Sequence, residues 1–423
     1  MLIGCHRICV LQYAEDYYRC TTGIVKDQLR KRLADKVSNE DRAKAWEKWI
    51  NNWCQFSLVG FLKSNIVTTV SILLDRDYQE EISYSDLRKL VPWPEEAISA
   101  YSVYTYTDLL DQCLMQYLRD DLANWWPPNM HHIDGGMSKL PEAFTIKNQH
   151  GWNKTVHLLD NITFNVTVND IEFTSPPWNG SDQNVNHVVV KGYNSTSEEL
   201  FVVEGDAVII ATPLHIIRQM KIHAKPNTQT DEIPSKTYSA IEDIWYAPST
   251  KVMLQFYTKF WEKKCGIKGG VSITNLPIGQ IYYPTSSSSN DSSSTDGRGI
   301  LLCYTWKAEA LLFGSLSSAG AIQEALREIA EIHDRETVEE EFEVGAVQAW
   351  YSDPAAQGAY ALLKPDQFKK VGYLYYPWKN IYFAGDGISF ASGWIQGALE
   401  SGLRAAYQFF VQNEPLSLGQ KKM

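Results

Sequence analysis

The chain has 423 residues, of which 44% are hydrophobic and 21% are charged, so it can bury a large core and form more than one domain. Its 39 Lys and Arg residues against 50 Asp and Glu residues give a net charge of -11, the wrong sign for binding phosphates, and we expect no nucleic-acid partner. No apolar run approaches the roughly 18 residues that cross a bilayer, so we expect a soluble protein without a membrane span. The aromatic content, 12%, exceeds what an ordinary core requires.

The cysteines and histidines indicate neither a disulfide scaffold nor a metal site. The seven cysteines are scattered without a CxxC motif, and no cluster of His, Asp or Glu has metal-ligand spacing. We therefore expect no metal, and free, partly buried thiols at Cys5, Cys9, Cys20, Cys54, Cys113, Cys265 and Cys303.

The cellular location stays open on two observations. The first residues contain no apolar stretch long enough for a signal peptide. Six N-x-S/T triplets would nevertheless be glycan acceptors in a secreted form, although polar strands and loops also generate such triplets by chance. The triplets begin at Asn153, Asn161, Asn165, Asn179, Asn194 and Asn290, and we predict that Asn161 and Asn165 lie in a strand.

The first 130 residues are predicted to be mostly helical. Between 39 and 64, apolar residues recur at three- and four-residue steps, which predicts an amphipathic helix with Asn39 as its N-cap. The residues of this apolar stripe are Ala43, Trp46, Ile50, Trp53 and Cys54. Similar periodicity predicts helices at 78–90, 95–105 and 107–126.

The middle of the chain changes to strand patterns. Alternation with period two and short β-branched runs predict a β-rich region over roughly 150–213. Further apolar runs lie within 245–285, followed by a Ser-rich loop at 286–297. A buried strand is predicted at 299–306, and a helix at 321–334.

The last organised unit is a short strand at 380–386 that turns through small residues into a long helix. Such a turn places unpaired backbone N–H groups and the positive end of the helix dipole at the carboxyl end of the strand. That arrangement receives an anion or the electron-rich edge of a ring. Strand–glycine–helix units without a ligand are also common, so the pattern alone does not specify a site.

Four segments resemble the flavin-dependent amine oxidases, and within them the L-amino-acid oxidase branch. They are HHIDGGMSKLPEAF, PSTKVMLQFYTKFWEK, VQAWYSDPAAQGAYALLKP and NIYFAGDGISFASGWIQGALESGLRAA. The resemblance implies FAD as the cofactor and an α/β (α+β) fold. That fold has an FAD-binding doubly wound domain, here incomplete, and a substrate domain that combines a mixed sheet with a helical subdomain.

The resemblance also implies a division of the chain. We expect the helical part of the substrate domain over 1–130 and a returning FAD-binding segment with the β-rich region over 131–215. The substrate-binding domain would follow over 216–350, a C-terminal FAD-binding segment over 351–412, and a tail over 413–423.

One part of the family pattern is missing. The family opens with a G-x-G-x-x-G turn that holds the FAD diphosphate, and no such motif occurs in this sequence. The arginine that binds the substrate carboxylate in the family also lies upstream of the matching region. The sequence is then either a truncated form of an oxidase or a chain that has lost its cofactor site. Lacking the central first strand of the flavin-binding sheet, it is expected to aggregate when expressed alone.

The resemblance carries individual roles onto this sequence. Lys251 matches the lysine that holds a water beside the flavin, and Tyr304 matches a tyrosine that binds the substrate carboxylate. Gly393 and Trp394 begin the helix that faces the flavin ring, so we count them with Lys251 and Tyr304 as catalytic candidates. Each also has a purely structural explanation, such as helix packing or core filling.

The remaining candidates line the substrate pocket or contact the cofactor. The predicted pocket walls are Trp306, Trp350 and Tyr360. The predicted cofactor contacts are Gly135, Gly136, Met137, Ile162, Gly385, Asp386, Gly393, Trp394 and Ile395.

The activity that the resemblance implies is oxidative deamination of an L-amino acid. Hydride transfer from the α-carbon to FAD would give an imino acid, which water hydrolyses to a 2-oxo acid and ammonia, while oxygen is reduced to hydrogen peroxide. The partners would be a small amino acid or amine and oxygen; a homodimer stays open. Two alternatives remain: a non-catalytic remnant of the fold, and a monoamine- or polyamine-type oxidase.

Overall fold

The computed structural model describes the larger part of the chain. The described residues are 22–23, 25–26, 29–30, 38–64, 92–105, 110–123, 133–145, 158–174, 187–225, 232–284 and 297–413. The helix predicted at 78–90, the triplets at Asn153, Asn179 and Asn290, and the cysteines Cys5, Cys9 and Cys20 lie outside these residues.

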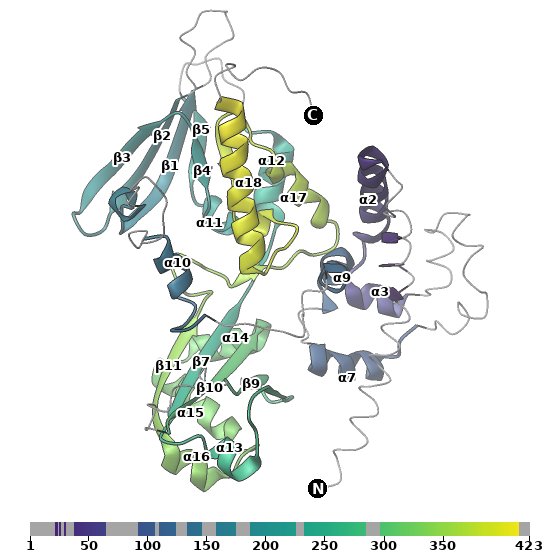
Figure 1. Ribbon diagram of the computed structural model, residues 1–423, viewed down its shortest axis with the longest axis vertical. Coiled ribbons are helices and arrows are strands. Elements are labelled where there is room, and N and C mark those ends of the chain that lie inside the picture. Colours follow the sequence, from purple (N-terminus) through teal and green to yellow (C-terminus); the bar gives the residue numbers. More distant parts are fainter. Residues whose placement is uncertain are drawn as a thin grey trace, which may run out of the picture.

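Helices and sheets are arranged in three groups. A five-stranded sheet with its helices forms the lower part of the view in Figure 1, and a four-stranded sheet lies with the long C-terminal helix in the upper part. A group of helices from the N-terminal third stands to the right. The mixed helix and sheet content confirms the expected α/β class.

The helical group contains α2 (Asn39–Trp53), α3 (Leu58–Lys63), α7 (Glu95–Thr105) and α9 (Leu114–Ala123). The single helix predicted over 39–64 was wrong in three respects. It is broken at 54–57, where Ser57 forms a β-bridge with Cys113. Its N-cap is Ser38, whose Oγ accepts the Asp41 N–H, and not Asn39. Its buried stripe is Ala45, Trp49 and Trp53 at steps of four, so Ala43 and Trp46 face outward.

The β-rich region forms the four-stranded sheet, in the order β3-β2-β1-β5. Its strands are β1 (Val166–Thr174), β2 (His187–Asn194), β3 (Glu199–Gly205) and β5 (Lys221–Ala224). Only the β1–β5 pair of this sheet is parallel. The prediction that Asn161 and Asn165 lie in a strand was wrong. Asn161 ends a 3-10 turn, η1 (Leu158–Asn161), and Asn165 has φ 61°, a turn conformation that Asn tolerates.

The five-stranded sheet has the order β11-β7-β10-β9-β8, and each of its pairs is antiparallel. Its strands are β7 (Ser249–Phe256), β8 (Val271–Ile273), β9 (Gln280–Tyr282), β10 (Gly299–Trp306) and β11 (Phe342–Ala349). The helices α13 (Phe260–Cys265), α14 (Lys307–Ser315), α15 (Ser318–Ile329) and α16 (Arg335–Glu341) contribute to its core. The strand predicted at 299–306 is confirmed, whereas the helix predicted at 321–334 ends at Ile329.

One face of this sheet is buried and the other is more open. Val252, Leu254 and Cys303 are fully buried against the helices. Because successive side chains of a strand point to opposite faces, the residues between them lie on the other face, Lys251 and Tyr304 among them. The sheet therefore presents those two residues away from the hydrophobic core.

A small parallel sheet leads into the C-terminal helix. In the described part of the chain it consists of β4 (Val208–Ile210) and β13 (Ile381–Phe383), which pair in parallel. The chain continues from β13 through η2 (Asp386–Ile388) into α18 (Ile395–Asn413), as the strand-to-helix pattern predicts. Beside them lie the pair β6 (Tyr246–Ala247) and β12 (Tyr360–Ala361), and the helices α11 (Leu214–Ile217), α12 (Ser235–Asp243) and α17 (Phe368–Tyr375). The short helix α10 (Lys139–Ala143) precedes the four-stranded sheet in the chain.

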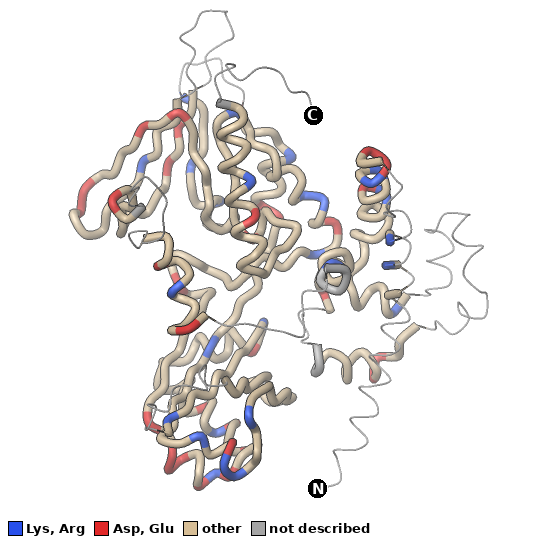
Figure 2. Tube along the Cα trace, viewed as in Figure 1, with Lys and Arg blue, Asp and Glu red and all other residues tan. Residues whose placement is uncertain are grey.

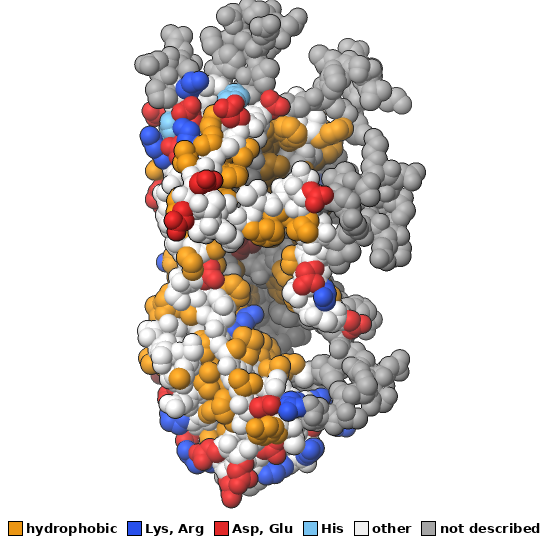
Figure 3. Space-filling model, turned by 90° about the vertical axis from the view of Figure 1, so that its left-hand side faces the viewer, with side chains coloured by type: hydrophobic (Ala, Val, Ile, Leu, Met, Phe, Trp, Pro, Cys, Tyr) orange, Lys and Arg blue, Asp and Glu red, His pale blue; other side chains and the backbone are white. Residues whose placement is uncertain are grey.

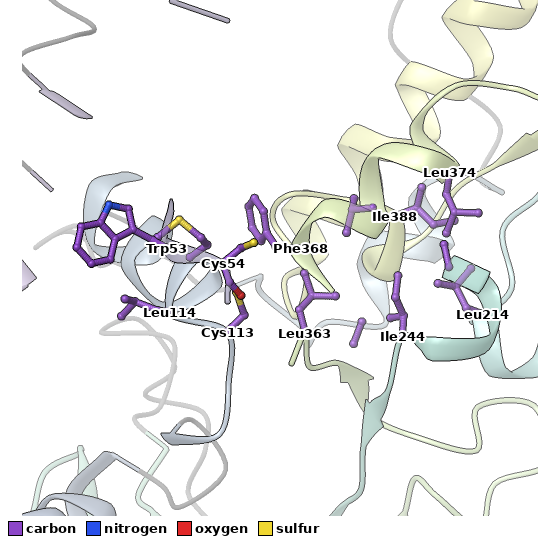
Figure 4. Close-up of a cluster of buried hydrophobic side chains, with 14 of the residues drawn as sticks. Trp53, Cys54, Cys113, Leu114, Leu214, Ile244, Leu363, Phe368, Leu374 and Ile388 are labelled. Atoms are coloured by element: carbon purple, nitrogen blue, oxygen red, sulfur yellow. The ribbon is translucent and has the colours of Figure 1, made fainter. Parts of the chain in front are cut away.

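One hydrophobic core joins the helical group to the C-terminal part. In Figure 4, Trp53, Cys54 and Cys113 of the helical group lie on one side, and Leu363 and Ile388 continue the cluster toward α11. The backbone reinforces this contact, because the Cys113 N–H donates to Leu363 O at 2.7 Å and the Asp366 N–H donates to Cys54 O at 2.7 Å. The helical group is thus held directly against residues 361–366.

Four further features can be read from the described residues. No described helix is long and apolar enough to cross a membrane. Lys and Arg are interspersed with Asp and Glu in both the upper and the lower parts of the trace (Figure 2). Cys54, Cys113 and Cys303 are free and buried, and Cys265 is free and exposed. Within the described ranges, no three His, Cys, Asp or Glu side chains are grouped as a metal site would need.

Candidate active site

The register of β7 and β10 places Lys251 directly beside Tyr304. The two residues are antiparallel partners, and Lys251 has Gln348 of β11 on its other side. The Lys251 Nζ lies 4.7 Å from the centre of the Tyr304 ring, a distance at which a cation is attracted to the ring face. Two candidates that are 53 positions apart in sequence thus meet on the open face of the five-stranded sheet.

A row of aromatic rings continues from Tyr304 toward the C-terminal helix. The ring centres of Tyr304 and Trp306 are 4.1 Å apart. The ring centres of Trp306 and Tyr360 are 5.3 Å apart, and their ring planes are nearly perpendicular, at 84°. A Cβ added to Gly393 would lie 3.2 Å from the Tyr360 ring, so the ring packs on the backbone of that glycine. The row therefore links Lys251 to the turn that begins α18.

Burial changes the acid–base properties at both ends of the Lys251–Tyr304 pair. It lowers the pKa of Lys251 below its ordinary value, because the charged ammonium loses water. It raises the pKa of Tyr304 to about 12, so the phenol is protonated at neutral pH and can donate a hydrogen bond. A phenol that can donate a hydrogen bond and an amine with a lowered pKa thus stand side by side.

The strand-to-helix turn after β13 is built around the buried Asp386. Its Oδ2 accepts the Ala361 N–H at 2.9 Å, and the backbone N–H groups of Gly387 and Gly393 also hydrogen-bond the carboxyl group. Burial outweighs these donors and raises the pKa of Asp386. Gly385 has φ 125° and Gly393 has φ 84°, conformations that favour glycine, which accounts for both residue types.

Two neighbours of this turn had not been identified from the sequence. Tyr246 accepts the Leu214 N–H at 3.3 Å, and a Cβ on Gly387 would overlap its hydroxyl group. The Ser401 Oγ both accepts the Gly385 N–H at 2.8 Å and donates to Gly385 O at 2.9 Å. A serine on the buried face of α18 was a weak signal, whereas Tyr246 lies in a two-residue strand that shows no periodicity.

The remaining candidates take separate places. Trp350 follows β11, and its N–H donates to Ser249 O at 3.0 Å, next to the start of β7. Trp394 is half-buried, and its carbonyl accepts the Ala398 N–H at the start of α18. Ile395 is exposed, at 53%.

The predicted contacts to the other end of the cofactor lie outside the aromatic row. Gly135 and Gly136 have φ 84° and 95° in the turn before α10, and Met137 next to them is 51% exposed. Ile162, in the segment before β1, is also exposed. In the described part of the chain, no ring contact or hydrogen bond joins these four residues to the Lys251–Gly393 row. Their roles stay predictions.

The open face of the five-stranded sheet continues from Lys251 as an apolar surface. Met253 of β7, Ile300 of β10 and Val344 of β11 are exposed on this face, and they alternate with the buried residues of the core. Figure 3 shows hydrophobic side chains gathered over the lower half of that view, the part of the molecule that holds this sheet. The Lys251–Tyr304 pair thus lies at the border of an apolar surface.

Curated relatives share sequence with this chain. The chain is 30% identical to a putative L-amino-acid oxidase, YobN, of Bacillus subtilis (strain 168) over 301 residues, which are 70% of this chain and 55% of the Bacillus protein. It is 29% identical to an L-amino-acid oxidase of Crotalus adamanteus over 299 residues, 69% of this chain and 51% of the snake protein. The chain thus spans about half the length of the curated relatives it matches.

A solved structure and a family model extend the comparison. A wild-type putrescine oxidase bound to putrescine superposes on 95% of this chain and 76% of its own, with a TM-score of 0.57 and 16% identity, which supports a shared fold. The model of flavin containing amine oxidoreductases matches residues 66–408. The row from Lys251 to Gly393, with the strand end at Gly385-Asp386, lies within this match, and the chain belongs to the flavin-containing amine oxidoreductase family.

Proposed function

We propose that this chain contributes the substrate-binding part and the flavin-facing turn of an FAD-dependent oxidase that deaminates L-amino acids. The observation that carries the proposal is the continuous row from Lys251 through Tyr304, Trp306 and Tyr360 to Gly393. The identity to L-amino-acid oxidases supports the choice of substrate class.

FAD is the cofactor that the family membership indicates, and the residues at the end of the row fit a flavin ring. Gly393 is exposed and has no side chain, so a planar ring can approach the backbone at the start of α18. The N-terminal N–H groups of this 19-residue helix favour negative charge at that point. We assign Gly385, Asp386, Gly393, Trp394 and Ile395 to this end of the cofactor.

The glycine-rich turn that usually binds the diphosphate of FAD does not occur in this sequence. The sequence contains no G-x-G-x-x-G. We propose Gly135, Gly136, Met137 and Ile162 as contacts beyond the ring, and we assign no residue of this chain to the diphosphate.

Bound FAD would supply the oxidising equivalents for removing a hydride from the substrate. The chain's own residues would orient that substrate. The protonated Tyr304 hydroxyl would donate to the substrate carboxylate, and Trp306, Trp350 and Tyr360 would keep water from the reacting carbon. Lys251, with its lowered pKa, would hold a water in the pocket and exchange a proton with it.

The test is a reconstitution of the purified chain with FAD, followed by assays for peroxide, ammonia and 2-oxo acid. We expect a bound flavin spectrum and equal amounts of the three products from L-amino acids, with none from D-amino acids or putrescine. Lys251→Met should lower kcat about 100-fold, within the range for loss of a proton-transfer group. Lys263→Met on α13, where the lysine is exposed, is the matched control and should leave the rate unchanged.

Two results would overturn the proposal in different directions. A chain that folds but binds no FAD would be a non-catalytic relative of the oxidases. Peroxide from amines that lack a carboxylate, with none from amino acids, would assign the chain to the amine-type oxidases instead.

A further inference from the structure

The side chain of Gln116 joins three separate segments of the molecule. Gln116 lies on α9 and is 1% exposed. Its Nε2 donates to Ser392 Oγ at 2.5 Å and to Ala361 O at 3.4 Å, and its Oε1 accepts the Leu363 N–H at 2.8 Å. Both donor hydrogens and the acceptor oxygen of the amide are therefore used. A buried amide with all its groups paired specifies one arrangement of its partners.

Asp386 also contacts two of these segments, the one that contains Ala361 and the turn before α18. Ala361 has its carbonyl bound by Gln116 and its N–H bound by Asp386 Oδ2. The turn before α18 is likewise held at two adjacent residues, at Ser392 by Gln116 and at the Gly393 N–H by Asp386. The contacts form a closed ring from Gln116 through the turn to Asp386, and back through Ala361.

The helical group cannot move independently of this ring. Three residues before Gln116, the Cys113 N–H donates to Leu363 O, and Cys113 and Leu363 share the hydrophobic core drawn in Figure 4. A shift of α9 would pull Gln116 away from Ser392, whereas the apolar contacts around it have no comparable directionality.

We propose that Gln116 is a positioning residue through which the helical group sets the conformation of the Ser392–Trp394 turn. The turn is where the proposed function places the flavin ring, so the consequence for the cofactor rests on that function; the positioning itself does not. Gln116 reaches the turn through the Ser392 Oγ, so a change at either residue would act on the Lys251–Gly393 row through the conformation of the turn.

The first test uses hydrogen exchange in the chain without FAD. Gln116→Met keeps the side-chain volume and removes the hydrogen bonds of the amide group. Ser392→Ala removes only the hydroxyl group that accepts from Gln116 Nε2. We expect the amides of 391–395 to exchange at least about tenfold faster in both variants, the equivalent of one lost buried hydrogen bond, while those of β10 stay unchanged. The double variant should exchange no faster than Gln116→Met, because the two substitutions remove one shared contact.

Gln112→Met is the matched control. Gln112 is also a buried glutamine, 3% exposed, four residues earlier, and its Oε1 has no hydrogen-bond partner among the described residues. It should leave the exchange of 391–395 unchanged. Unchanged exchange in Gln116→Met and Ser392→Ala, or an equal increase in β10, would overturn the proposal.

The second test separates this inference from the proposed function. In FAD-reconstituted protein, Gln116→Met should raise the Kd for FAD about tenfold and shift the flavin absorption maximum, while Gln112→Met does neither. If the wild-type chain binds no FAD, the proposed function fails and the exchange experiment still decides the role of Gln116. If FAD binds equally to wild type and Gln116→Met, with the same spectrum, the link from the turn to the cofactor is wrong.

Discussion

Two opposing effects act on the charged form of Lys251. A lysine on a strand between the buried Thr250 and Val252 loses hydration, and this desolvation lowers its pKa. The Tyr304 ring, 4.7 Å from Nζ, attracts the charged form instead. The lowered pKa is the result of burial, so the side chain is less favourable for the folded state at neutral pH than an apolar one of the same length.

We therefore expect Lys251→Met to stabilise the fold while it removes the amine. Between the lowered pKa of Lys251 and its ordinary value of 10.5, the unfolded chain binds a proton that the folded chain does not, so wild-type stability rises with pH through this window. Thermal unfolding should give Lys251→Met a higher Tm than wild type at pH 7, and the difference should shrink toward pH 10.5. A lower Tm for the variant at pH 7 would contradict this account.

At the scale of single elements, two helical glycines give opposite expectations. Gly314 of α14 lies against the sheet, and an added Cβ would come within 2.7 Å of Tyr351, 2.8 Å of Ala349 and 2.9 Å of Thr250. Gly372 of α17 has nothing within 4 Å of such an atom. The first glycine is required by close packing, and the second only loosens its helix.

Substituting each glycine by alanine tests this difference. Gly314→Ala should destabilise the chain by about 1–3 kcal/mol through overpacking. Gly372→Ala should stabilise it by about 0.5–1 kcal/mol, because alanine has the higher helix propensity. The measurement is the denaturant midpoint of each variant compared with that of wild type. A midpoint of Gly314→Ala equal to that of wild type would show that the helix α14 adjusts to the extra methyl group.

The elements also show what the sequence could predict. Strand β10 and helix α18 were found because a regular alternation and a strand–glycine–helix turn depend on local residues alone. The stripe predicted for α2 included Trp53 and Cys54, which are buried, but placed Ala43 and Trp46 on the buried face where Ala45 and Trp49 lie. Trp46 and Trp49 are equally apolar, so only tertiary packing decides which one faces the core. The ring of contacts around Gln116 was invisible, since its members are up to 276 positions apart.

At the scale of the whole molecule, α18 carries an exposed apolar face in addition to its buried face. Gly397, Ser401 and Ala405 face the β13 side, whereas another face carries the exposed residues Ile395, Leu399, Leu403, Tyr407 and Phe410. The parallel sheet beneath it has only β4 and β13 among the described residues, and Ile209 of β4 is 42% exposed.

This exposed face should drive association of the isolated chain, as contiguous apolar patches do. We expect Leu403→Gln combined with Tyr407→Gln to shift the chain toward smaller species in sedimentation velocity and light scattering. Leu311→Gln with Leu312→Gln, which removes two exposed leucines from α14, is the control. If the control pair reduces association as strongly, the α18 face is not its cause.

The alternation of side chains along β7 and β10 places the hydrophobic core on one face of the sheet and the candidate site on the other. Core residues such as Val252 and Cys303 lie between Lys251, Met253, Leu302 and Tyr304, which point to the other face. Substitutions at Met253 and Leu302 would therefore change the open face of the sheet on an unchanged core. By contrast, inserting or deleting one residue within either strand would exchange the two sets, so that core residues face outward and the fold is lost.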